Sequence, residues 1–358
     1  MTYSGEGNVN CSRLKPIACL VGLLVLPGCI EPAHVEGDWT ALGRPASAEL
    51  YTLSERDARA LLEDFSRAMR LVESKMSLAQ PGSELQQLNL EAQSGYYRVT
   101  DRDLFRCVTL ALDYARASEG TYDPTIGPLT LLYDRARPGL PDEGAIDRAL
   151  EHVGWERVAL ERKLFAVHFL SPEMRLDLSG MVEGYALDVA ARKFVRTGSL
   201  GGVLRLGHQI YAWGLPPGEQ SWSVEVTDPR VEEPTPLARI RLQSSRGIGV
   251  SGSGGDSELV LDPRTGRPAA GDVIVAVAIA DSVADAIAVS RALLVGGSSR
   301  AGALLSKTRR VESLLLVRGA GEPYVIASAS LQGRLELMGE LAGEPSGGPR
   351  FLLPPSEL

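Results

Sequence analysis

The chain has 358 residues, of which 44% are hydrophobic and only 6% aromatic, and its formal net charge is −8. This is enough apolar material for one large core or two smaller ones, which excludes disordered and fibrous proteins. The basic residues are scattered singly among acids rather than clustered. That distribution argues against a nucleic-acid partner.

The N-terminus has the pattern of an export signal that ends at a cysteine. Arg13 and Lys15 precede an apolar run, residues 16–27, which is too short to span a bilayer. The run ends in Leu-Pro-Gly-Cys, which is typical of a bacterial lipoprotein signal. The sequence therefore predicts that Cys29 becomes the lipidated first residue of the mature protein.

This interpretation divides the N-terminal region into a signal peptide, residues 1–28, and a tether, residues 29–40. It places the protein outside the cytoplasm, lipid-anchored on the periplasmic side of a bacterial membrane, with the outer membrane favoured. Two alternatives remain open: an uncleaved membrane anchor, and an ordinary structural cysteine at position 29.

The cysteine count leaves no pair in the mature chain. Cys11 and Cys19 would leave with the signal and Cys29 would carry lipid, so Cys107 remains alone. A disulfide framework, an iron–sulfur cluster and a cysteine zinc site are therefore excluded. Cys107 falls in an apolar helical pattern, which predicts a core position.

Helices are predicted where apolar residues recur at helical spacing behind a capping residue. Ser54 with Asp57 predicts the start of a core helix whose apolar positions continue to Val72. Asp101 predicts the cap of a second helix, which Gly120 would end. Further helices are predicted at residues 142–153, 182–196, 282–295 and 299–306.

Strands are predicted after a turn at residues 41–53 and at residues 157–161, 164–169, 174–178, 203–206, 221–227, 238–242, 257–262 and 273–280. The expected fold class is α+β: mixed, largely antiparallel sheets with packed helices, in one domain over residues 41–340. The Pro- and Gly-rich end, residues 341–358, is expected to form a flexible tail. No G-x-G-x-x-G fingerprint follows a strand, so a Rossmann crossover is not expected.

The stretch LDLSGMVEGYALDVAARKF, residues 176–194, predicts a strand, a turn and a helix. Gly180 and Gly184 carry no Cβ, so the turn can approach a charged ligand closely, and the helix N-terminus favours phosphate. By itself this pattern is equally consistent with a plain structural turn.

Five further stretches accompany this corner in a fixed order. They are TYDPTIGPL (residues 121–129), GVLRLGHQIYAWG (202–214), GVSGSGG (249–255), LDPRTGRPA (261–269) and ADAIAVSRALLVGG (284–297). Together with the corner they resemble the motifs of the ApbE family, the FAD:protein FMN transferases, over about residues 38–340. The resemblance implies an ApbE-like, T-fold-like α+β architecture.

It also implies an activity. The family's reaction is a phosphoryl transfer in which a Ser or Thr hydroxyl of a partner flavoprotein attacks the riboflavin-side phosphorus of FAD, and AMP leaves. Such chemistry needs in-line geometry, charge neutralisation and a divalent cation, and Mg²⁺ accepts one or two carboxylates with carbonyl oxygens. The chain has no obvious acceptor motif of its own, so the implied partners are FAD and a separate flavinylated protein.

The resemblance assigns the metal site residue by residue. Asp285 matches the family's metal-binding Asp, and the backbone carbonyl of Gly180 matches a further ligand. A Thr usually follows the Asp four residues on, where this chain has Val289, and Ser290 is the nearest hydroxyl. A helix irregularity would bring Ser290 into place. Without one that ligand is lost, and Asp285 can also be understood as a first-turn acid that favours the helix dipole.

The resemblance also implies contacts to FAD. The expected cofactor-binding positions are Leu42, Ala79, Thr121, Tyr122, Asp123, Asp177, Glu183 and Val260. From spacing alone Asp123 is a turn-capping residue. Arg264 is expected either to clamp a phosphate as a catalytic residue or to tie two loops together.

Four positions depart from the family's pattern: Ala79 replaces a Tyr, His208 a glycine, Leu259 a His and Val289 a Thr. These changes put turnover in more doubt than the fold. Two hypotheses are therefore kept beside the transferase: an FAD pyrophosphatase, and a lipoprotein that binds or scavenges flavin without chemistry. A lipoprotein that binds only a protein partner is a weaker third.

Overall fold

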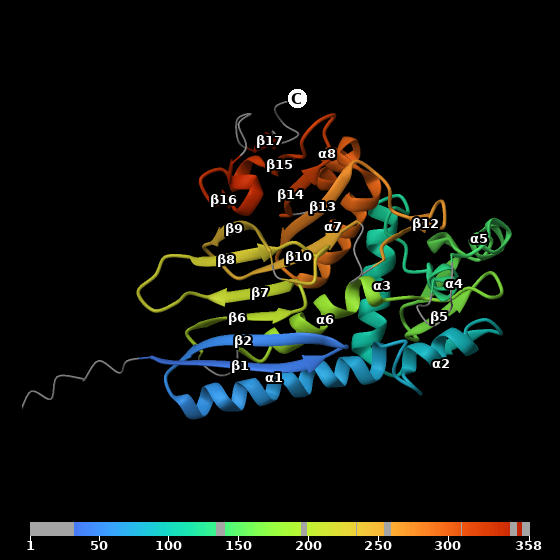
Figure 1. The fold of residues 1–358 in the computed structure, drawn as a ribbon. Coiled ribbons are helices and arrows are strands. Elements are labelled where there is room, and N and C mark those ends of the chain that lie inside the picture. Colours follow the sequence, from blue (N-terminus) through green and yellow to red (C-terminus); the bar gives the residue numbers. More distant parts are fainter. Residues whose placement is uncertain are drawn as a thin grey trace, which may run out of the picture. The chain divides into compact units, whose positions relative to one another are not determined.

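A long, almost wholly antiparallel sheet is the main element of the fold (Figure 1). The computed structural model describes residues 32–133, 140–194, 199–233, 235–253, 259–308, 310–343 and 349–352, so the predicted signal and Cys29 lie outside the described residues. Within them the sheet has nine strands in the order β1-β2-β6-β7-β10-β13-β14-β15-β17, and only the β15–β17 pair is parallel.

The strands of this sheet are β1 (Ala33–Ala41), β2 (Arg44–Thr52), β6 (Gly201–Leu206), β7 (Gln209–Gly214), β10 (Arg246–Gly252), β13 (Val273–Ala280), β14 (Glu312–Val317), β15 (Tyr324–Ser328) and β17 (Arg350–Leu352). Three smaller sheets are formed by β16 (Leu335–Leu337), β9 (Pro236–Leu242) and β8 (Trp222–Thr227), by β3 (Tyr96–Arg98), β5 (Ala166–Phe169) and β4 (Val158–Glu161), and by β11 (Leu261–Asp262) and β12 (Arg267–Pro268).

The helices are α1 (Glu55–Met76), α2 (Glu84–Glu91), α3 (Arg102–Ala117), α4 (Gly127–Leu132), α5 (Glu143–Leu150), α6 (Ser179–Ala191), α7 (Val283–Gly296) and α8 (Ser298–Lys307). The predicted caps are confirmed, because the Ser54 hydroxyl accepts from the Asp57 amide and the Asp101 carboxylate accepts from the first turn of α3. None of the helices in this part of the chain is both long and apolar enough to cross a membrane.

The large sheet is covered on both faces, which explains why β13 is apolar at every position. Val275, Val277 and Ile279 pack toward the sheet of β8, β9 and β16. The alternating small residues Ala276 and Ala278 belong to the core under the helices. A strand buried on both faces loses the apolar–polar alternation of a half-exposed strand.

Helix α7 lies unusually close to this sheet. A Cβ added to Gly249 on β10 would come within 2.4 Å of the α7 backbone at Ala286 and Ile287. Glycine is therefore required where α7 crosses β10, and the position of α7 over the sheet is fixed by backbone packing.

Three expectations from the sequence are corrected. Residues 33–40 of the predicted tether belong to β1, which pairs with β2 along its whole length. Residues 350–352 of the predicted tail form β17 beside β15. Residues 174–178 form no strand: one isolated bridge joins Arg175 to Ile126, and α6 begins at Ser179 rather than at 182.

Candidate functional site

A cavity of about 470 Å³ opens where four of the sequence motifs meet. Its walls are Gly43, Arg44, Thr121, Tyr122, Asp123, Ile126, Thr130, Asp177, Ser179, Gly180, Leu259, Val260, Leu261, Pro263, Arg291 and Val295. The volume lies in the range of small-molecule and cofactor sites. The structure therefore brings together six predicted FAD or metal positions: Thr121, Tyr122, Asp123, Asp177, Gly180 and Val260.

The tip of the β1–β2 hairpin forms one wall. Ala41 pairs with Arg44, so Leu42 and Gly43 are a two-residue loop, and both have positive φ (51° and 70°). That geometry matches the right-handed twist of a hairpin and is strained at the non-glycine residue. Predicted Leu42 packs partly against the main core, while Gly43 and Arg44 line the cavity.

The loop after α3 forms the second wall. Both carboxylate oxygens of Asp123 accept hydrogen bonds. Oδ1 accepts from the Thr125 amide (2.8 Å) and hydroxyl (2.7 Å), and Oδ2 accepts from the Trp155 amide (3.1 Å). Burial raises the pKa of Asp123, although these bonds oppose the rise. Asp123 is thus the turn-capping residue that its spacing suggested, held at the cavity edge.

Tyr122 differs from its neighbours in this loop. Its side chain is buried and lines the cavity, and its hydroxyl has no hydrogen-bond partner among the described residues. Buried polar atoms are normally paired, so an orphaned hydroxyl at a cavity wall indicates a place for a polar ligand atom.

The corner at Asp177 is held from two sides. Asn89 exchanges two hydrogen bonds with the backbone of Leu176 (2.8 and 2.9 Å), and the Asp177 amide donates to the Pro124 carbonyl (2.7 Å). Asp177 Oδ1 then accepts from the Ser179 amide (2.8 Å) at the start of α6. The corner is therefore fixed to the Asp123 loop before any ligand arrives.

Helices α6 and α7 pack antiparallel through glycines. A Cβ on Gly180 would lie 2.9 Å from Cδ and Nε of Arg291, and a Cβ on Gly184 would lie 2.7 Å from the backbone of Val283 and Ala284. The cavity end of α6 therefore meets the C-terminal half of α7. The helix ends farther from the cavity meet at Asp188, which accepts from the amides of Val283 (2.8 Å) and Ala284 (3.0 Å).

The predicted metal ligands are separated by this packing. Asp285 lies in the first turn of α7, six residues before Arg291, which is about 9 Å along a helix axis. Tyr114 of α3 lies near it, and burial together with the Asp285 carboxylate raises the pKa of Tyr114. Asp285 is not among the residues that line the cavity.

The two other candidates for this site are buried in the core. Val289 is fully buried and apolar. Ser290 is also fully buried, where it donates to the Ile287 carbonyl (3.0 Å) and bonds to the Ser251 hydroxyl (2.9 Å). Helix α7 continues unbroken past both, so no irregularity turns Ser290 toward Gly180.

These placements do not fit a Mg²⁺ site of the expected composition. Among the described residues no group of three or more His, Cys, Asp or Glu side chains could hold a metal ion. The Cα of Gly180 faces the Arg291 side chain, which comes within 2.9 Å of an added Cβ.

The sequence did not predict the two cations of the site, Arg44 and Arg291. Glu183 lies between them: its Oε1 accepts from Arg44 Nε (3.2 Å), and burial raises the pKa of Glu183 while Arg44 and Arg291 oppose the rise. Glu183 faces a second cavity of about 420 Å³ that Arg44 also lines, together with His208. A signal existed for Arg291, since it is the single basic residue of α7.

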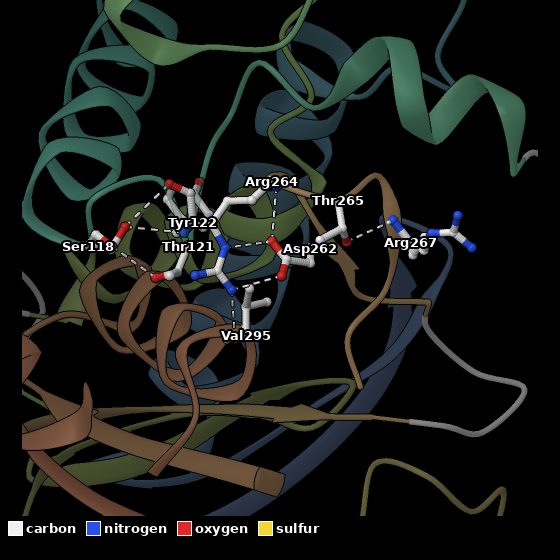
Figure 2. A network of polar contacts seen from close by, with 8 residues as sticks. All are labelled: Ser118, Thr121, Tyr122, Asp262, Arg264, Thr265, Arg267 and Val295. Carbon is white, nitrogen blue, oxygen red and sulfur yellow. Dashed lines mark hydrogen bonds and ion pairs between the residues drawn. The ribbon is translucent and has the colours of Figure 1, made fainter. Parts of the chain in front are cut away.

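Arg264 lies outside the cavity wall. Its guanidinium makes two bonds to Asp262, from Nε to Oδ1 (2.9 Å) and from Nη2 to Oδ2 (2.8 Å), and one to the Val295 carbonyl (3.3 Å), as Figure 2 shows. Of the two roles considered for it, this geometry favours tying the 261–266 loop to the end of α7. Ala79 is exposed after α1 and lines no cavity described above.

Comparison with known proteins identifies the family of this chain. The profile of the ApbE family matches residues 42–315. The chain is similar to the FAD:protein FMN transferases of Vibrio cholerae serotype O1 (25% identical, 84% of this chain and 93% of the relative) and Treponema pallidum (26% identical, 79% and 83%). Its fold is similar to that of the flavin transferase ApbE from Vibrio cholerae, with a TM-score of 0.75 and 22% identity over 85% of this chain and 99% of the other. With a family match over most of its length and the expected α+β architecture, this chain belongs to the ApbE family.

Proposed function

We propose that this protein binds FAD in the 470 Å³ cavity and transfers FMN to a Ser or Thr hydroxyl of a partner flavoprotein. The observation that carries the proposal is the convergence of the Asp177–Gly180 corner, the Thr121–Asp123 loop and Val260 on one cavity. The curated relatives carry the name of this activity. The acceptor oxygen forms a bond to the FMN-side phosphorus, the bond to the bridging oxygen breaks, the hydroxyl proton leaves, and AMP is released.

The chain's own residues would hold and orient the substrate. Arg44 and Arg291 bring positive charge to the diphosphate, and the Tyr122 hydroxyl donates to a polar atom of the ligand. Asp123 is not assigned the role of general base, because both of its oxygens already accept hydrogen bonds. The reaction is thus promoted by positioning and charge neutralisation.

The family resemblance also implies a requirement for Mg²⁺, which is tested separately from the transfer. Asp285, Val289 and Ser290 do not gather around Gly180, so no step is assigned to a metal ion here. AMP release measured with Mg²⁺ and with EDTA decides whether a divalent cation is needed.

The test uses the full chain in detergent with FAD and a peptide of the D-x-x-[ST]-[GA]-A-T pattern. We expect AMP by chromatography and a covalently fluorescent peptide. AMP without labelled peptide would favour the FAD pyrophosphatase. Bound flavin without AMP would favour a non-catalytic flavin-binding protein, which the apolar Leu259 at the cavity wall in place of the family's His supports.

We also propose that Cys29 carries lipid and anchors the protein to the periplasmic side of a bacterial membrane. The support is the sequence of the signal alone. Metabolic labelling with a fatty acid should label the wild type and not Cys29→Ala. Equal labelling of both would refute the lipid anchor.

A further inference from the structure

The charged residues on the wall of the large cavity are two acids and two arginines. Oδ1 of Asp123 accepts from the Thr125 hydroxyl of its own loop, Oδ2 of Asp123 accepts from the Trp155 amide, and Oδ1 of Asp177 accepts from the Ser179 amide. Arg44 and Arg291 come from different elements, the hairpin tip and α7, and meet at the same cavity. An anionic ligand therefore encounters two guanidinium groups here, beside two carboxylates that already accept hydrogen bonds.

Arg291 lies beside the carbonyl-bearing residue that the family resemblance gives to the metal. The 2.9 Å separation between its Nε and a Cβ added to Gly180 shows that the guanidinium fills the space left by the missing side chain. A divalent cation on the Gly180 carbonyl would stand next to this permanent positive charge and be repelled.

The arginines of the wall also face a carboxylate that lies outside it. Arg44 and Arg291 both interact with Glu183, which offsets one of the two positive charges. A guanidinium also presents planar, paired donors that match phosphate oxygens.

We propose that Arg291, together with Arg44, binds the diphosphate of the dinucleotide directly and takes the place of the divalent cation in substrate binding. This rests on the proposed function in one respect, that the dinucleotide is FAD. The chain therefore binds FAD equally well with and without Mg²⁺.

The experiment measures equilibrium binding of FAD to the full-length protein by flavin fluorescence, in EDTA and in excess Mg²⁺. For the wild type we expect dissociation constants within about twofold of each other. Arg291→Met should weaken binding by about 10- to 100-fold in EDTA, the usual loss for a charge-assisted pair. Arg291→Lys, which keeps the charge, should lose less.

Arg246→Met is the matched control. Arg246 is largely buried and paired with Asp281 (2.7 Å), but it lines neither cavity described above, so FAD binding should not change. Gly180→Ala gives a second test, because its methyl group must displace the Arg291 head group and weaken binding without removing a charge. Thermal unfolding of each variant verifies that it is folded.

The outcomes separate this inference from the proposed function. A wild type that binds FAD only with Mg²⁺, or an Arg291→Met variant that binds as well as the control, overturns the inference. If the wild type binds FAD under neither condition, the proposed function fails, and inorganic pyrophosphate in EDTA becomes the probe. If the wild type binds pyrophosphate and Arg291→Met does not, the result supports binding of the diphosphate by the two arginines. If the wild type does not bind pyrophosphate, the inference is overturned.

Discussion

The two ends of α7 make different contacts. At its N-terminal end Asp188 caps two backbone amides, and Asp285 lies near Tyr114. At its C-terminal end Arg291 and Val295 line the large cavity. The acids therefore hold α6, α3 and α7 together, while the ligand meets a cation.

This difference shows what a motif can and cannot predict. The stretch ADAIAVS predicts the start of α7 after a strand, and that prediction is confirmed. The direction of each side chain depends on how α7 rotates against its neighbours. Here the glycines of α6 and β10 set that rotation.

The largest expected effect is on folding, at Asp188. Its carboxylate accepts from two backbone amides at the start of α7 in a partly buried position. Asp188→Ala leaves both amides without an acceptor, so we expect a loss of about 2–4 kcal/mol in the free energy of unfolding. Urea denaturation measures it. Asp188→Asn, which retains one acceptor oxygen, is the control and should lose less; equal stability of all three proteins would contradict the capping role.

The raised pKa of Asp188 also predicts that the free energy of unfolding depends on pH. Burial raises the pKa of Asp188 to about 7, with Asp285 adding to the rise and the two amides and Arg192 opposing it. An acid whose folded pKa lies above its unfolded value of about 4 holds an extra proton in the folded state between those values. Its contribution to stability is therefore complete below about pH 4 and falls by about 1.4 kcal/mol per pH unit toward pH 7.

Comparison of the wild type with Asp188→Asn separates the pH dependence of stability that Asp188 causes from that of the other titrating groups. The difference in unfolding free energy between the two proteins should change between pH 5 and 7 and stay constant above about pH 8. A difference that is constant over the whole range would show that Asp188 keeps an ordinary pKa in the folded protein.

Most of the fold and about half of the candidate site could be predicted from the sequence. Capped amphipathic helices such as α1 and α3 depend on local patterns, so their predictions are confirmed. The strand β1 was missed because its alternation at a sheet edge resembles a polar tether. Arg44 and Arg291 were missed because their meeting depends on long-range packing between the hairpin tip and α7, which no local spacing encodes.

A smaller effect is expected at Glu183. Its carboxylate offsets the two arginines, so Glu183→Gln should increase the positive charge at the cavity and tighten FAD binding by about 3- to 10-fold in EDTA. Glu225→Gln is the matched control, because Glu225 lines the second cavity but pairs with Arg239 instead. Isothermal titration measures both. Weaker binding by Glu183→Gln would mean that this carboxylate contacts the ligand itself.

The smallest effect is expected at Asp285, where the family's motif predicted the largest. If its carboxylate only lies near Tyr114 in the first turn of α7, Asp285→Asn should leave FAD affinity within about twofold, with Mg²⁺ or EDTA. The control is the surface variant Asp281→Asn, which removes one acid near the same helix. If Asp285→Asn lost FAD binding at least tenfold only in Mg²⁺, while remaining as stable as Asp281→Asn, then the N-terminal end of α7 would belong to the ligand site. In that case α7 would contact the ligand at both of its ends, and Asp285 would have the metal-binding role that the family resemblance implies.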